Sequence, residues 1–254
     1  MIRNVVLGMG LVLLWAPVAA GGQPDVDRMT PKEILDRVDD LYRGDSAEGR
    51  MRMKVVTEHW TREMEMEFYS KGEDKSLVRI LSPKKDKGTA TLRVGDKIWN
   101  YLPKVNRVIK VPSSMMGSSW MGSHFTNNDL VKESRMAEDY TFEKVFDGQR
   151  DGQAVIEIEC HPKPNAAVVW GKLLVRVRRA GMQPLRIIYY DEDMEKARTL
   201  KFTDIRQFDD RRVPAVMRME PEDAPDEFTE VEYQKVKFDV DLADRRFSLR
   251  SLKR

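Results

Sequence analysis

Apolar and polar residues alternate with a period of two along much of this chain. Met51, Met53 and Val55 alternate with the basic residues between them. A second segment repeats the pattern with glutamates between its apolar positions, which are Met64, Met66 and Phe68. Because successive side chains of a strand point to opposite faces, this pattern predicts strands with one apolar and one solvated face. About eleven strands are expected, the last at 247–249, at a spacing typical of a β-sandwich or β-barrel.

One helix is predicted ahead of the strands, over residues 30–43. Thr30 and Glu33 form a capping-box pattern, with Pro31 at the first helical position. Gly44 marks the end of the pattern, and before it apolar residues recur at helical spacing as one stripe: Ile34, Leu35, Val38, Leu41 and Tyr42. An amphipathic helix of this kind needs an apolar surface to cover its stripe. Further helical signal is limited to residues 112–136 and a turn at 241–245.

The first 20 residues have the pattern of a secretory signal peptide. Arg3 provides the basic start, and the apolar run from Val5 to Trp15 is too short to span a bilayer. Val18 and Ala20 are small residues at the positions that precede a cut after Ala20. An uncleaved membrane anchor is the alternative. We expect a cleaved signal peptide at residues 1–20, one domain over residues 21–254, and a periplasmic location.

Composition narrows the classes of function. Charged residues make up 34% of the chain, yet the net charge is only +2. This balance predicts a mixed, solvated surface and argues against nucleic-acid binding. Cys160 is the single cysteine, so an intrachain disulfide is impossible and no disulfide-linked partner is expected. No apolar stretch after the signal is long enough for a transmembrane helix.

The sequence lacks a recognisable catalytic or metal-binding pattern. Around Ser119, the glycine that would complete a nucleophile elbow is replaced by Met121. Ser123 and His124 are neighbours, which does not make a catalytic triad. The three histidines show no metal-ligand spacing. We therefore expect no catalysis, metal or cofactor; a hydrolase with Ser119 or Ser123 as its nucleophile is the enzymatic alternative.

Flexible apolar side chains gather on the predicted inner face. Methionine adapts to varied apolar shapes and specifies a fixed core weakly. The methionines therefore indicate either ordinary core filling or a cavity for a flexible apolar ligand. The stretch MMGSSWMGSHF, residues 115–125, adds more apolar surface on a backbone with two glycines. We interpret residues 112–129 as a lid segment over the open side of the sheet; the alternative is a loop packed permanently on the core.

A block at residues 98–130 carries a family resemblance. It contains IWNYLP at 98–103, Arg107, Lys110 and SWMGSHFTNNDL at 119–130. The segments LSP at 81–83, KGTA at 87–90 and RFSLRSL at 246–252 fit the same pattern. Together they resemble the outer-membrane lipoprotein-sorting protein family of LolA-like periplasmic carriers. His124 stands where that family usually has an acidic residue, so a lid contact made by the acid is in question here.

The resemblance implies a mainly β fold: an incomplete, strongly curved antiparallel β-barrel closed by helices and a lid loop. It also implies a carrier that binds acyl chains of a lipoprotein or lipid and moves them between the inner and outer membranes. Some relatives are associated with inner-membrane transporters. An accessory subunit of such a transporter, binding a protein partner in the same cavity, is the alternative. The predicted ligand-binding residues of cavity and lid are Met51, Met53, Val55, Met64, Met66, Phe68, Trp99, Tyr101, Met115, Met116, Trp120, Met121 and Phe125.

We predict that Gly21 is the first residue of the mature protein, because small residues at 18 and 20 follow a short apolar run. The intact mass of protein recovered from the periplasm measures this directly. A species that retains Met1 in a membrane fraction would contradict both the cleavage and a shuttling carrier.

Overall fold

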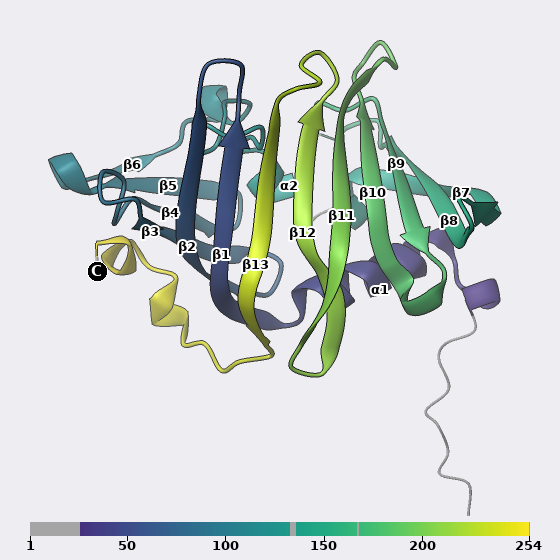
Figure 1. The fold of residues 1–254 in the computed structure, drawn as a ribbon, viewed down its shortest axis with the longest axis horizontal. Helices are drawn as coiled ribbons and strands as arrows, with labels where there is room; N and C mark the ends of the chain where they lie inside the picture. The colour runs from purple at the N-terminus through teal and green to yellow at the C-terminus, as the bar shows by residue number, and fades with distance from the viewer. Residues whose placement is uncertain (1–25, 133–135, 167, 254) are drawn as a thin grey trace, which may run out of the picture.

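The computed structural model describes residues 26–132, 136–166 and 168–253. Within these residues, thirteen strands form a single antiparallel sheet that curves strongly but does not close (Figure 1). The predicted signal peptide and its cleavage site lie outside the described residues. No helix in the described ranges has both the length and the apolar character needed to cross a bilayer. The mainly β, unclosed fold is confirmed, with two strands more than the predicted number.

The strands are β1 (Ser46–Val56), β2 (Thr61–Lys71), β3 (Lys75–Ser82), β4 (Ala90–Val94), β5 (Lys97–Leu102), β6 (Arg107–Lys110), β7 (Tyr140–Arg150), β8 (Gln153–Pro162), β9 (Lys172–Arg178), β10 (Gln183–Tyr190), β11 (Lys196–Phe208), β12 (Arg211–Pro221) and β13 (Phe228–Phe238). The α-helices are α1 (Pro31–Arg43), α2 (Asp129–Lys132), α3 (Met136–Asp139) and α4 (Leu249–Leu252). Short 3-10 turns are η1 (Val26–Arg28), η2 (Pro103–Val105), η3 (Ser113–Met115), η5 (Ala180–Met182) and η6 (Asp244–Arg246).

The strand order explains why the chain has to cross its own sheet. Strands run outward from β1 to the edge strand β6, and the chain then passes to the opposite edge at β7. It returns strand by strand to β13, which pairs with β1 in the middle of the sheet. The lid segment and the short helices α2 and α3 make up the connection between the two edges. A connection between opposite edges of an open sheet must lie over one of its faces.

Helix α1 follows its sequence pattern closely. The Glu33 backbone N–H donates to Thr30 Oγ1 at 3.3 Å, and the Thr30 backbone N–H donates to Glu33 Oε2 at 2.7 Å, which completes the capping box. The sequence stripe is buried, with Ile34, Leu35 and Val38 in the main core. The helix ends at Gly44, whose backbone has φ of 64°. A Cβ there would also lie 2.8 Å from a carboxylate oxygen of Asp239.

The C-terminal strap, residues 239–253, packs on a second cluster of the sheet. Leu242, Phe247 and Leu252 are buried there against Leu77 and Leu92. The predicted strand at 247–249 is wrong, because Leu249 begins the short helix α4. The alternation of Phe247 and Leu249 suggested a strand, but Leu249 is 48% exposed. The buried residues are Phe247 and Leu252, which are five positions apart. A turn followed by a helical turn provides that spacing.

We predict that Leu252→Ala lowers the free energy of unfolding by about 2–5 kcal/mol, because Leu252 is fully buried between the strap and the sheet. Leu249→Ala, in the same helical turn, is the matched control and should change it by less than about 0.5 kcal/mol. Urea unfolding followed by circular dichroism measures both. Equal effects of the two substitutions would mean that the strap is not packed as described.

Candidate functional site

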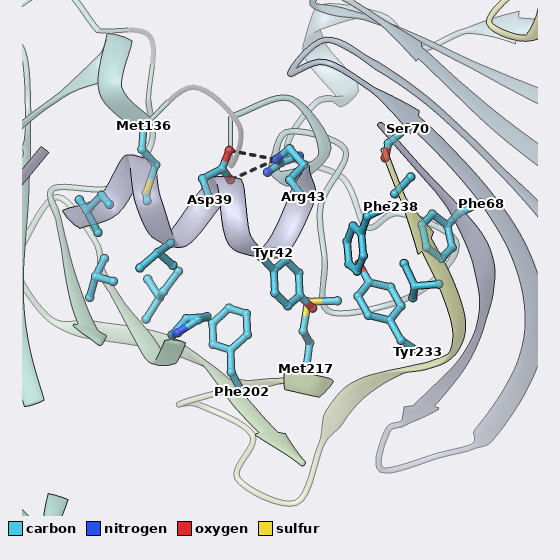
Figure 2. Close-up of a pocket in the computed structure, with 17 residues that line it drawn as sticks. Asp39, Tyr42, Arg43, Phe68, Ser70, Met136, Phe202, Met217, Tyr233 and Phe238 are labelled. Atoms are coloured by element: carbon cyan, nitrogen blue, oxygen red, sulfur yellow. Dashed lines mark hydrogen bonds and ion pairs between the residues drawn. The ribbon is translucent and has the colours of Figure 1, made fainter. Parts of the chain in front are cut away.

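The candidate site is an apolar pocket of about 200 Å³ between α1 and the inner face of the sheet (Figure 2). Helix α1 forms one wall, and strands from both halves of the sheet form the other. The lining residues are Leu35, Val38, Asp39, Tyr42, Arg43, Ala47, Phe68, Ser70, Met136, Val175, Pro184, Ile187, Phe202, Met217, Tyr233, Val236 and Phe238. The pocket therefore depends on elements that are far apart in the sequence.

Four aromatic rings form a continuous wall of this pocket. Tyr42 of α1 lies between Phe202 and Tyr233, with ring centroids 5.8 Å from each. Tyr233 in turn stacks on Phe68 at 5.3 Å. Aromatic pairs in this distance range contribute about 0.5–1.5 kcal/mol beyond their buried area. Tyr42 is therefore the residue through which α1 joins this aromatic wall.

The charged groups of the pocket lie together on one helix turn. Arg43 Nε donates to both carboxylate oxygens of Asp39, at 3.0 and 3.2 Å (Figure 2). Both side chains are partly exposed, 25% for Arg43 and 40% for Asp39. The remaining lining is apolar or aromatic except for Ser70. Such a pocket can bind an apolar chain, with polar groups only where a head group would meet water.

A β-bulge determines which residues of β13 reach the pocket. Arg50 pairs with Lys235 and Met51 with Tyr233, so Gln234 is the extra residue of β13. The bulge brings Tyr233 and Val236, three residues apart, to the same pocket. Simple alternation would have placed one of them on the outer face.

The predicted methionine cluster is buried but does not line this pocket. Met51, Met53, Met64 and Met66 have at most 7% exposure and belong to the main core, together with Val55, Trp120 and Phe125. Among the predicted residues that the structure describes, Phe68 lines the pocket and the other twelve do not. The inner face is thus filled by methionine at one place and hollow at another. A ligand-binding role for the methionines stays a prediction.

Trp99 and Tyr101 lie in a different environment from the one predicted. Both pack against the second cluster, beneath the C-terminal strap. Register explains this, because Trp99 pairs with Leu92 and Tyr101 with Ala90, both members of that cluster. The inward residue of this strand is the buried Ile98, which alternates with Trp99.

The lid segment crosses the inner face and is bonded to four strands. Trp120 Nε1 donates to Thr91 Oγ1 of β4 at 3.0 Å, and Arg62 of β2 donates to the Met121 carbonyl at 3.1 Å. Trp120 and Phe125 are buried, Met116 and Met121 are half-buried, and Met115 is 51% exposed. Other hydrogen bonds connect the segment to β13 and β11, through Thr229 and Arg198. The segment covers the sheet, but it does not line the pocket.

His124 ties the lid segment to the start of β13. Its Nε2 lies 3.0 Å from Glu227 Oε2, and its Nδ1 lies 2.8 Å from Thr229 Oγ1. The Glu58 backbone N–H and the His124 ring hold the pKa of Glu227 below its usual value. A carboxylate whose folded pKa is lowered stabilises the fold at higher pH and loses this contribution as pH falls through that pKa. The contribution of the Glu227 carboxylate to this tie is therefore present at neutral pH and is lost in acid.

Arg198 of β11 makes the other polar tie. Its guanidinium forms a two-pronged ion pair with Asp129, with Nη1 at 2.9 Å from Oδ2, and also donates to the His124 carbonyl at 3.3 Å. The side chains are 7% and 14% exposed. Arg198 lies over the rings of Trp170 and Tyr189, at 4.5 and 4.4 Å from their centroids. The ion pair, the hydrogen bond and the two rings thus hold the arginine, and the lid segment is tied to it.

The candidate nucleophiles are used in turn structure. Ser119 Oγ donates to the Ser123 carbonyl, and Ser123 Oγ donates to the Trp120 carbonyl at 2.7 Å. His124 bonds to Thr229 and Glu227, and within the described residues neither serine bonds to its ring. Burial raises the pKa of the Cys160 thiol to about 12, so it is neutral at physiological pH. No group of His, Cys, Asp and Glu in the described ranges could hold a metal ion.

The pocket residues that sequence reasoning missed come mainly from the C-terminal half, including Ile187, Phe202, Met217, Tyr233 and Phe238. Alternation in these strands indicated apolar faces, but it did not indicate where the helix leaves space. Tyr42 belonged to the predicted helical stripe, and its position near the end of that stripe was the available signal.

Comparisons with known proteins agree with this geometry. An open, curved antiparallel sheet covered by a helix and a crossing loop defines the LolA-like class of fold. A protein-family model described as "uncharacterized protein" matches residues 72–254, well over half of the chain. The chain belongs to this family. No curated protein matches it.

Three solved structures are similar over nearly their whole length. An outer membrane lipoprotein-sorting protein domain from Vibrio parahaemolyticus is 25% identical, with a TM-score of 0.74, covering 88% of this chain and 96% of that one. A LolA superfamily protein from Nitrosomonas europaea is 20% identical, with a TM-score of 0.74, covering 88% of this chain and 99% of that one. A DUF1329 family protein from Desulfovibrio piger is 23% identical, with a TM-score of 0.78, covering 86% of this chain and 96% of that one. The resemblance to the lipoprotein-sorting family is confirmed.

We predict that Arg198→Met frees the lid segment, because it leaves the partly buried Asp129 carboxylate without its ion-pair partner, at a cost of up to about 3–5 kcal/mol. Amides of residues 118–127 should then exchange hydrogen faster, while those of β1 and β2 stay protected. Hydrogen exchange with mass spectrometry measures both. Arg50→Met, at an exposed position of β1, is the control. Unchanged exchange in the Arg198 variant would show that packing of Trp120 and Phe125 is sufficient to hold the segment.

Proposed function

We propose that this chain is a non-enzymatic periplasmic carrier that binds acyl chains of a lipoprotein or lipid and moves them between the inner and outer membranes. The observation that carries the proposal is the apolar pocket with an aromatic wall and its charged pair on one turn of α1. Each methylene group removed from water contributes about 0.8 kcal/mol, so acyl chains need a shielded site to cross an aqueous compartment. Names of the similar structures support lipoprotein sorting as the setting.

The size of the pocket bears on how it would be loaded. Its 200 Å³ is below the roughly 300–1,000 Å³ typical of ligand pockets. We infer that the described structure is the closed state and that α1 moves outward when a chain enters. The C-terminal end of α1 is held by Arg211, whose guanidinium donates to the Asp40 carbonyl at 2.6 Å. The N-terminal half rests on apolar packing and is the part we expect to move.

Release needs no bond making. A carrier transfers its cargo when an acceptor holds the acyl chains more tightly than the pocket does. The soft methionine core next to the pocket offers space into which longer chains could extend as side chains rearrange. This mechanism needs no cofactor, and it assigns no catalytic role to the serines of the lid segment.

We predict that Ala47→Phe weakens acyl binding at least tenfold, because the Ala47 side chain lines the pocket and a ring there would fill it. A fluorescent fatty acid measures affinity, and mass spectrometry of extracted lipid measures what the purified protein retains. Ala243→Phe, at an exposed position of the strap, is the matched control. Circular dichroism checks that both variants fold.

Two outcomes would contradict the carrier. Equal affinity of the Ala47 variant and the parent would place acyl binding elsewhere. A pocket that takes up no acyl probe while the protein co-purifies with one tight protein partner would favour the accessory subunit of an inner-membrane transporter.

A further inference from the structure

Charge is distributed very unevenly along this nearly neutral chain. Residues 75–128 contain ten Lys or Arg and two Asp, a net charge of +8, whereas the whole chain carries +2. The rest of the chain therefore has a net charge of −6. This segment forms strands β3 to β6 and the lid segment, so one end of the sheet is strongly basic. The small overall charge conceals this asymmetry.

The cations gather at two adjacent turns, which we call the basic tip: residues 83–88 between β3 and β4, and residues 102–110 of η2 and β6. The two turns touch, since a Cβ on Gly88 would lie 3.6 Å from the Pro103 ring. The carboxylate of the first turn, Asp86, is paired with Arg62 at 3.0 Å. Six exposed cations of the tip form no ion pair among the described residues: Lys84, Lys85, Lys87, Lys104, Arg107 and Lys110.

The same tip exposes apolar side chains. Val105 is 59% exposed, Ile109 is 47% exposed and Leu102 is 38% exposed. The turn between β5 and β6 is the outermost part of the sheet at the left of Figure 1. It is held rigidly, because Pro103 opens the turn and Tyr101 Oη donates to Asn106 Oδ1 at 3.3 Å. A projecting turn thus presents exposed apolar residues beside cations that form no ion pair among the described residues.

We propose that the basic tip docks this protein on the surface of a bilayer that contains anionic phospholipids. Exposed apolar side chains enter the boundary between head groups and acyl chains, while surrounding lysines and arginines attract anionic head groups. Strand β6 leads directly into the lid segment through Pro112, so docking would bring the covered side of the sheet close to the lipid. The biological use of this surface rests on the proposed carrier function, but its binding to lipid does not.

A second basic surface provides a matched comparison. The C-terminal strap carries four exposed cations, which are Arg245, Arg246, Arg250 and Lys253. The strap also contains three exposed acids, Asp239, Asp241 and Asp244. Phe247 and Leu252 of the strap are buried, which leaves Leu249 as its exposed large apolar residue. The strap therefore provides four exposed cations, against six on the tip, and lacks the apolar projection.

Co-sedimentation with vesicles tests the proposal. The purified chain should bind phosphatidylcholine vesicles mixed with phosphatidylglycerol and should bind pure phosphatidylcholine far less, with binding reduced by added salt. Neutralising the tip by Lys84→Gln, Lys85→Gln, Lys104→Gln and Arg107→Gln together should lower the partition coefficient roughly tenfold or more. The same number of substitutions on the strap, Arg245→Gln, Arg246→Gln, Arg250→Gln and Lys253→Gln, should change it less than about threefold. Equal losses from both sets, or no binding to anionic vesicles, would overturn the proposal.

A single apolar substitution separates insertion from simple charge attraction. Val105→Ser should weaken vesicle binding several-fold, whereas Val145→Ser, an exposed valine on the opposite edge strand β7, should not. Equal binding by both valine variants would contradict insertion of the tip.

The pocket variant Ala47→Phe should bind vesicles like the parent, and the neutralised tip should still bind the fluorescent fatty acid. Failure of the docking surface and failure of the carrier function therefore give different results.

Discussion

An open β-sheet with an apolar inner face has to be covered, and the rest of this structure follows from that requirement. A closed barrel would bury the face by itself, but the order of strands leaves β6 and β7 as opposite edges. Two elements cover the face instead, α1 and the connection between the edges. The two elements are held to the sheet by different interactions. Helix α1 packs through an apolar stripe, whereas the lid segment is also held by hydrogen bonds and an ion pair.

This difference divides the inner face into a filled part and a hollow part. The methionines of β1 and β2 share a dense cluster with Trp120 and Phe125, and methionine side chains adapt well enough to leave little space. Under α1 the ring of Tyr42 meets Phe202 edge to face and Tyr233 at a tilt, and rigid rings leave gaps that flexible chains would fill. Because Arg198 and His124 fix the lid segment, α1 is the cover with the fewest polar ties. We therefore propose that α1 is the cover that moves, and the role of residues 112–129 as a moving lid stays a prediction.

Much of the fold could be predicted from the sequence because its local signals agree with the final structure. The capping box at Thr30 and the alternation in β1 and β2 each describe an element that needs no distant partner to be recognised. The pocket could not be predicted in the same way. It depends on a bulge at Gln234, which reverses alternation without a sequence mark, and on where one helix rests against strands from both halves. Trp99 shows most clearly what the sequence leaves open. It belongs to the segment that resembles a known family, yet only its pairing with Leu92 determines which face of the sheet its side chain lies on.

The pairing of β1 with β13 joins the first and last strands of the chain, with Met53 opposite Val231. Most other neighbours in the sheet are consecutive hairpins that can form locally and early. Contacts between residues this far apart close a very large loop and slow folding. We expect the two meanders to form first and the central seam to join them last. Until then β1 and β13 are unprotected edges beside an uncovered apolar face, which is when the chain is most exposed to aggregation.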